Sequence, residues 1–267
     1  MKGVTYTRSP ESQQRMISFA QNHEDVLIDR VFQKQTGFFI DVGAFHPVFD
    51  SVTKYFSLAG WRGINVEPCA DVFGDLSRDR PNDINLNCAV SSSRGVVILH
   101  QLANKAMSTI SPGHLAELGP AYHGNHQRIE VEARTLADIC TEFVTGDIDF
   151  LTIDVEGSEA DVIKGADWMR FRPRLVVIEA TKPWSSELNC ENWEPYLLSQ
   201  GYIFCHFDGI NRYYLRREDA DLAGQLSVPV NVLDSYITYP ELRVRQQNAE
   251  QQSEIQRLCQ LLAAPRA

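Results

Sequence analysis

Four short apolar runs in this chain each carry an acidic residue at or near their end, and this recurrence constrains the fold more than any other feature. The acids are Asp41, Glu67, Asp154 and Glu179. Short apolar runs bounded by polar residues are typical of strands that are buried on both faces. Segments with helical character alternate with these runs, at 50–59, 69–79, 135–144 and 158–170. Alternating strands and helices predict an α/β fold with a mostly parallel sheet that helices cover on both faces.

Three further segments complete a predicted sheet of seven strands. Residues 83–90 read as a strand, and 96–100 as a short extra strand outside the main series. Residues 202–207 and 212–215 flank Asp208-Gly209, a strong turn signal, and predict an antiparallel hairpin at the end of the sheet. The stretch 103–134 shows little periodicity, so we expect a long loop or a helical flap over the sheet edge there.

Charge and composition exclude several classes of protein. The formal net charge is −10, which argues against a nucleic-acid backbone as the main partner. No run approaches the roughly 20 apolar residues of a membrane helix, so we expect no membrane span. The six cysteines are widely spaced and form no CxxC pair, which makes a zinc knuckle unexpected and favours a reducing cytoplasm.

The four strand-end acids should surround one crevice. Ligands of open α/β sheets bind beyond the carboxyl ends of the strands, and parallel strands bring those ends to the same edge. Gly43 follows the first acid and allows close backbone approach, but a full GxGxxG cradle for a pyrophosphate is missing. Glu67 lies 24 positions after Gly43, near the spacing at which an acid reaches ribose hydroxyls. Together these features predict a nucleoside-like cofactor without a pyrophosphate.

Residues 21–215 resemble the FkbM-type methyltransferases. The resemblance rests on the strings FFIDVGAFHPVFDSVTKYF, WRGINVEP, INLNCAVSS, IDFLTIDVEGSEADVIKGADW and RLVVIEATKPW, with residues 153–159 as the most specific motif, and on an N-terminal Gln/Glu/Asp motif at 21–25. It implies a Rossmann-like class I fold and an S-adenosylmethionine (SAM)-dependent O-methyltransferase that acts on a sugar hydroxyl, in bacterial surface polysaccharide or glycolipid biosynthesis. The chain departs from the family pattern at Phe45, His46 and Pro47, where the family has Asn and further Gly.

The resemblance also implies roles for individual residues. Asp41 and Gly43 would line the methionine and ribose side of SAM, and Glu67 would accept hydrogen bonds from the ribose diol. Asn87, Cys88 and Ala89 would lie near adenine. Asp154 would close the pocket at the methionine end, and Glu156 and Glu179 would face the acceptor.

A sugar hydroxyl is a poor nucleophile until its proton is removed, so a base is expected. The candidates are His206, Glu179 and Glu156, with Asp154 and His46 as further options. Metal assistance is the alternative, because Asp154, Glu156 and Glu179 offer hard oxygen ligands to Mg²⁺ or Ca²⁺. The spacing of these residues does not require an ion.

Candidate residues for binding the acceptor are His46, Trp184, Asn211 and Arg212. Plainer interpretations stay open for several candidates. His206 lies in an apolar strand and is typical of a core histidine, and Trp184 is typical of a packing anchor. His46 can cap a helix, and turn preference explains Asn211 nearly as well as a binding role does.

The chain divides into an N-terminal arm at 1–20, a catalytic domain at 21–235 and a C-terminal helix at 236–267. The last segment is rich in Glu, Gln and Arg and free of glycine over 240–262, which predicts a helix. This helix is either solvated or a tether, to a second copy in a homo-oligomer or to a fused glycosyltransferase domain. Two rival functions remain: a nicotinamide-dependent oxidoreductase, and a scaffold that has lost turnover.

Overall fold

A computed structural model of the chain describes residues 16–123 and 126–263. Its main sheet has seven strands and is mixed. In spatial order these are β10 (Tyr202–Phe207), β11 (Asn211–Arg216), β9 (Leu175–Glu179), β8 (Phe150–Ile153), β2 (Phe38–Val42), β3 (Arg62–Val66) and β4 (Ile84–Leu86). Strand β11 runs antiparallel to both of its neighbours, whereas the pairings from β9 to β4 are parallel. The predicted α/β fold and its terminal hairpin are therefore confirmed.

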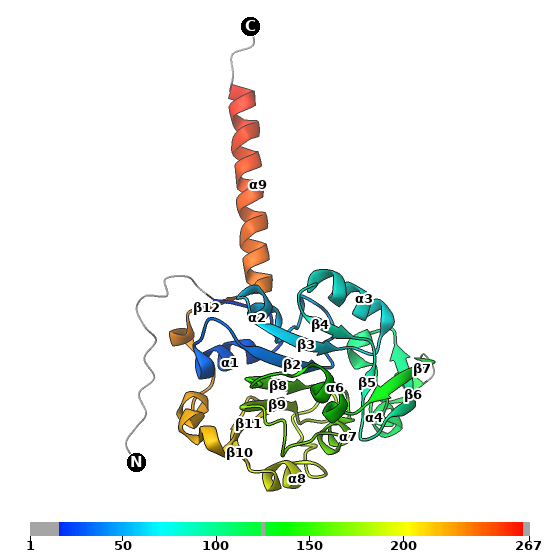
Figure 1. Ribbon diagram of the computed structural model, residues 1–267. Coiled ribbons are helices and arrows are strands. Elements are labelled where there is room, and N and C mark those ends of the chain that lie inside the picture. Colours follow the sequence, from blue (N-terminus) through cyan, green and yellow to red (C-terminus); the bar gives the residue numbers. More distant parts are fainter. Residues whose placement is uncertain (1–15, 124–125, 264–267) are drawn as a thin grey trace.

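Helices cover both faces of this sheet (Figure 1). On one face lie α1 (Glu24–Phe32) and α2 (Lys54–Leu58), whose apolar side chains pack on Phe39, Phe150 and Val177. On the other face α6 (Leu136–Phe143), α7 (Glu159–Lys164) and α8 (Glu194–Ser199) pack on the intervening residues, such as Ile40 and Ile178. Side chains of successive strand residues point to opposite faces, so both positions in each alternation are apolar. Helix α3 (Ala70–Asp79) follows β3.

The stretch expected to be a loop or flap contains a strand of nine residues, which corrects the prediction. Strand β7 (His126–Arg134) pairs antiparallel with β6 (Gly95–Leu102) and parallel with β5 (Ala89–Val90) in a second sheet. The flap character is confined to η1 (Lys105–Met107), α4 (Pro112–Glu117) and α5 (Pro120–His123). The sequence hid β7 because most of its side chains are polar and partly exposed, so that cross-strand pairing decides its conformation. The strand predicted at 83–90 is split between β4 and β5, in two different sheets.

Segments far apart in the sequence meet at one edge of the molecule. Strand β1 (Met16–Ser18), within the predicted arm, pairs in parallel with β12 (Tyr236–Thr238). Between β11 and β12 the chain forms η2 (Arg217–Leu226) and η3 (Val232–Asp234). From β12 the chain enters α9 (Tyr239–Ala263), which projects away from the body (Figure 1). In the described part of the chain, no helix is long and apolar enough to cross a membrane.

The first helix, α1, begins at Glu24. Its N-cap is His23, which adopts the left-handed conformation at φ 65°. The backbone N–H of Asn22 instead donates to Glu24 Oε2 at 2.8 Å. The turn before α1 is thereby fixed at the carboxyl edge of the sheet.

Candidate active site

The turn after β2 ties three strand ends together at the carboxyl edge of the main sheet. The backbone N–H of Gly43 donates to the carbonyl of Val66, and that of Asp154 donates to the carbonyl of Val42, both at 3.0 Å. Gly43 has φ 86°, and a Cβ there would lie 1.7 Å from the Asp154 carbonyl oxygen. Only glycine fits this position, because both the conformation and the space exclude a side chain.

Glu67 lies directly after β3 and is held by backbone donors. Its carboxylate accepts from Cys69 N at 2.7 Å and from Phe45 N at 3.0 Å, and only 5% of the residue is exposed. Burial raises the pKa of Glu67 to about 7, and the two backbone hydrogen bonds oppose that rise. The side-chain amide of Asn87 donates to the carbonyl of Glu67 at 2.8 Å and so fixes the strand end that carries the acid.

A narrow apolar slot opens beside this acid. Gly43, Pro68, Cys88, Ala89 and Val155 are among its lining residues. Such a narrow apolar lining suits a flat heteroaromatic ring. Because Glu67 borders the slot, the pair offers a place for a base and an acceptor for the hydroxyls of an attached ribose.

A second hollow shares Gly43 with this slot, and its lining is partly polar. Asp41 is buried there and accepts from Thr53 Oγ1 at 2.6 Å and from Thr152 Oγ1 at 2.8 Å. Burial raises the pKa of Asp41, while these hydroxyls favour its ionised form. Asn211 donates to Glu24 Oε1 at 2.8 Å in the same lining. The start of α1 and the hairpin strand β11 thus close this cavity from two sides.

Three carboxylates converge at its border. One oxygen from each of Asp154, Glu156 and Glu179 lies within 4.8 Å of the other two. Asp154 is exposed to solvent in the crevice although protein surrounds it on most sides. The surrounding protein and the neighbouring acids raise the pKa values of both Asp154 and Glu179 well above the ordinary range. Close carboxylates of this kind either share a proton or hold a cation.

The flap contributes a histidine to this cluster. His114 of α4 is buried, and its Nε2 lies 2.8 Å from Glu156 Oε2. Thr109 Oγ1, also from the flap, donates to the carbonyl of Glu156 at 2.6 Å. The flap therefore hydrogen-bonds the backbone of this acidic residue and places an imidazole beside its side chain.

The model of the methyltransferase FkbM domain matches residues 41–204, which span the glycine turn, Glu67 and the three carboxylates. The chain belongs to the FkbM methyltransferase family. Among curated proteins no relative matches it. The family implies SAM as the cofactor, and the apolar lining of the slot beside Glu67 has the chemistry that an adenine ring needs.

Other predicted residues of this FkbM methyltransferase lie away from the carboxylates. His46 Nδ1 accepts from the backbone N–H groups of Val48 and Phe49, at 3.0 and 2.9 Å, and so closes its own turn. Arg212 alternates with Asn211 along β11 and faces the opposite side of the sheet, where it pairs with Glu194 at 2.7 Å.

His206 lies in β10, two strands from Val177 of β9, which lines the polar cavity. Two strand spacings amount to about 10 Å. Its ring packs on Tyr213 at 5.6 Å between centroids, and burial lowers the pKa of the imidazole. The structure therefore does not bring His206 to the carboxylates, whereas it does bring Asn211 into the cavity lining.

Trp184 follows β9 in a short loop and is 72% exposed, with φ 56°. The loop is closed by a backbone hydrogen bond from Lys182 to Glu187 at 2.9 Å and by an ion pair between the same two residues. An indole held outward in this way is not a packing anchor.

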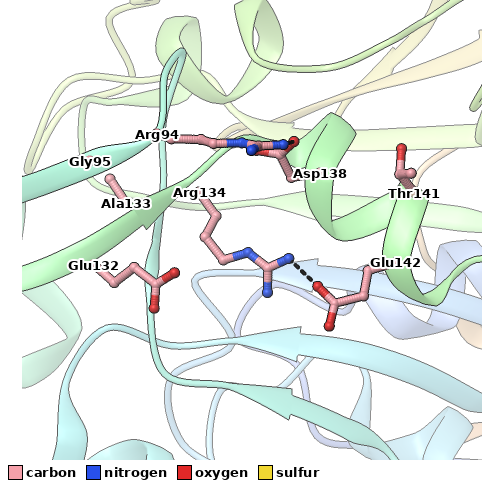
Figure 2. Close-up of a pocket in the computed structure, with 8 residues that line it drawn as sticks. All are labelled: Arg94, Gly95, Glu132, Ala133, Arg134, Asp138, Thr141 and Glu142. Atoms are coloured by element: carbon pink, nitrogen blue, oxygen red, sulfur yellow. Dashed lines mark hydrogen bonds and ion pairs between the residues drawn. The ribbon is translucent and has the colours of Figure 1, made fainter.

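A further open hollow lies apart from this crevice, between the second sheet and α6 (Figure 2). Arg94 and Arg134 line it, but Arg94 pairs with Asp138 and Arg134 pairs with Glu142 at 2.5 Å. Both guanidinium groups already have carboxylate partners, so the hollow adds nothing to the site.

Proposed function

We propose that this protein transfers the methyl group of SAM to a sugar hydroxyl, in bacterial surface polysaccharide or glycolipid synthesis. The observation that carries the proposal is the position of Glu67 at the border of an apolar slot, next to a glycine turn without a pyrophosphate cradle. The sugar as acceptor rests on the resemblance to the family and on the outward indole of Trp184, because indoles stack on sugar faces. A Rossmann-like class I arrangement agrees with the position of this slot beyond the strand ends.

Different residues of the chain bind the different parts of SAM and the acceptor. The slot receives adenine, Glu67 accepts from the ribose hydroxyls, and the polar cavity takes the methionine end. SAM, when bound, supplies the methyl group as a reactive sulfonium and leaves as S-adenosylhomocysteine. Glu156 and Glu179 face the acceptor, take the proton of its hydroxyl and hold its oxygen in line. The raised pKa of Glu179 suits this role, since a base works best when its pKa lies near the working pH.

The first test is cofactor binding, measured by calorimetry with S-adenosylhomocysteine and separately with NADH. We expect S-adenosylhomocysteine alone to bind, and Glu67→Ala to weaken it by about 1–3 kcal/mol through lost charge-assisted hydrogen bonds. Binding of NADH alone would establish the oxidoreductase rival. Unchanged affinity in Glu67→Ala would remove that residue from the site. S-adenosylhomocysteine binding without methyl transfer to any methyl glycoside would instead indicate a scaffold.

The second test identifies the base by turnover of Glu156→Gln, Glu179→Gln and His206→Ala on the best methyl glycoside. Loss of a general base lowers turnover by about 10²–10⁴-fold at constant cofactor affinity. We expect this loss in at least one of the two carboxylate variants. His206 stays a candidate for the base until His206→Ala is measured. Full activity of that variant would show that His206 is a core residue and not the base.

A divalent cation is the remaining option at Asp154, Glu156 and Glu179, since their oxygens form a compact set of hard ligands. We propose Mg²⁺ or Ca²⁺ there as an aid to hydroxyl ionisation. Dialysis against EDTA should then abolish turnover, and Mg²⁺ or Ca²⁺ should restore it. Turnover that survives thorough chelation would leave the carboxylates to act alone.

A further inference from the structure

We propose that His114 is a positioning residue that fixes the carboxylate of Glu156 toward the acceptor. The inference rests on the proposed function and assigns a role to a flap residue outside the strand-end acids. Four observations carry it: the backbone conformation of Glu156, the contacts that hold it, the confinement of the imidazole and the charges around the carboxylate.

Glu156 has a left-handed backbone at φ 54°, and Gly157 follows at φ 89°. A left-handed conformation is unfavourable for a residue with a side chain and persists only where its surroundings impose it. Here they do: Thr109 Oγ1 donates to the carbonyl of Glu156 at 2.6 Å, and Glu159 Oε1 accepts from Gly157 N at 3.0 Å. Such strain is concentrated at functional sites.

The imidazole of His114 is confined on several sides. Its own backbone N–H donates to Ser111 Oγ at 3.2 Å, which caps α4. Its ring packs against Gly157, where a Cβ would lie 2.6 Å from His114 Cβ and 2.8 Å from Nδ1. The absence of a side chain at Gly157 therefore makes room for the histidine. His114 Nε2 lies 2.8 Å from Glu156 Oε2, although this buried nitrogen meets hydrogen-bond geometry with no acceptor in the described part of the chain.

The acidic cluster makes the orientation of Glu156 important. Oxygens of Asp154 and Glu179 lie within 4.8 Å of an oxygen of Glu156, so any negative charge that the cluster keeps disfavours Glu156 in the crevice. His114 Nε2 lies beside one carboxylate oxygen of Glu156 and leaves the other for the acceptor hydroxyl. Misplacement of a reacting group by about 1 Å can lower a rate 10²-fold, so the histidine should affect turnover and not cofactor binding.

The test compares His114→Ala, His114→Gln and the matched control Glu117→Ala, an exposed residue on the same helix. Turnover and KM are measured with labelled SAM and a panel of methyl glycosides, S-adenosylhomocysteine affinity by calorimetry, and folding by thermal melting. We expect His114→Ala to lose about 10–100-fold in kcat at unchanged S-adenosylhomocysteine affinity. His114→Gln should recover at least tenfold of this loss, because its amide N–H can reach the same oxygen. Glu117→Ala should match the wild type.

Other results overturn the inference. It fails if His114→Ala is as active as Glu117→Ala, and also if His114→Gln is folded, binds S-adenosylhomocysteine and is as slow as Glu156→Gln. If His114→Ala does not fold, this comparison of His114→Gln with Glu156→Gln decides alone. Wild-type protein that binds S-adenosylhomocysteine but methylates no glycoside sinks the proposed function first, and this inference with it.

Discussion

At the scale of single residues, Glu67 shows how one position serves both fold and ligand. Its carboxylate is buried, which favours the neutral form, yet it accepts from Phe45 N and Cys69 N, which favours the charged form. Burial prevails, and the pKa lies at about 7. A group in this balance changes its charge in the range where most enzymes work.

Affinity for S-adenosylhomocysteine should therefore depend on pH. Only ionised Glu67 can accept from both ribose hydroxyls, so we expect affinity to rise between pH 6 and 8 as the carboxyl loses its proton, and Glu67→Gln to flatten that rise. Calorimetry across this range measures it. A wild-type profile as flat as that of the glutamine variant would contradict the assignment.

The stability of the ligand-free fold should show the opposite trend. The folded pKa of Glu67 is raised above the unfolded value of 4.5, so its contribution is complete below pH 4.5 and is lost as the pH rises through about 7. Glu24 and Asp25 are buried acids with pKa values also raised to about 7, and they act in the same direction.

Residue identity predicted the strand-end part of the site better than the flap part. Gly43, Glu67, Cys88 and Ala89 could be placed because their strands fix their positions. His114 could not, since its contact with Glu156 joins two segments 42 positions apart with no shared periodicity. The available signal was Ser111-Pro112, a cap followed by proline, which is typical of a helix start.

At the scale of elements, the loops beyond the carboxyl edge supply contacts and side chains of the candidate site that the strands do not carry. The flap between β6 and β7 holds Glu156, and the loop after β9 presents Trp184. Alternation along β11 predicts that Asn211 and Arg212 face opposite sides, so only one of them can line the cavity. The sequence alone supports the placement of Asn211 and Arg212 on opposite faces, whereas it gives no signal for the pairing of β7 with β6.

Trp184→Ala should raise KM for the glycoside about threefold to tenfold, because a stacking contact on the sugar face is lost. Turnover at saturation and S-adenosylhomocysteine affinity should stay unchanged, since the indole is exposed and is not among the residues that line the slot. Trp184→Phe, which keeps an aromatic face, is the matched control. An unchanged KM in Trp184→Ala would show that Trp184 is not part of the acceptor site.

At the scale of the whole molecule, one buried ion pair joins the beginning of the domain to its end. Arg30 of α1 donates to Asp234 of η3 from Nε at 2.9 Å and from a terminal nitrogen at 2.6 Å. The same guanidinium also donates to the carbonyls of Gln225, Val228 and Pro229. These contacts fix the segment that leads into β12 and α9.

Asp234→Ala should destabilise the fold by about 3–5 kcal/mol, because it leaves a buried guanidinium without its carboxylate. Urea unfolding measures the loss, and Asp221→Ala, at an exposed acid in η2, is the control. A loss below about 1 kcal/mol would show that the carbonyl contacts suffice to hold Arg30.

Helix α9 would convert a small tilt at its base into a large displacement of its tip. Its foot, Tyr239, packs on Phe19 at 4.9 Å and on Phe49 at 5.6 Å between ring centroids, and Phe49 belongs to the turn that His46 closes. A rod of 25 residues is about 37 Å long, so a tilt of about 10° at those rings displaces its tip by about 6 Å. A small movement of the turn that His46 closes would therefore become a large movement of the tip of α9. A force on that tip would act in turn on the rings of Phe19, Phe49 and Tyr239.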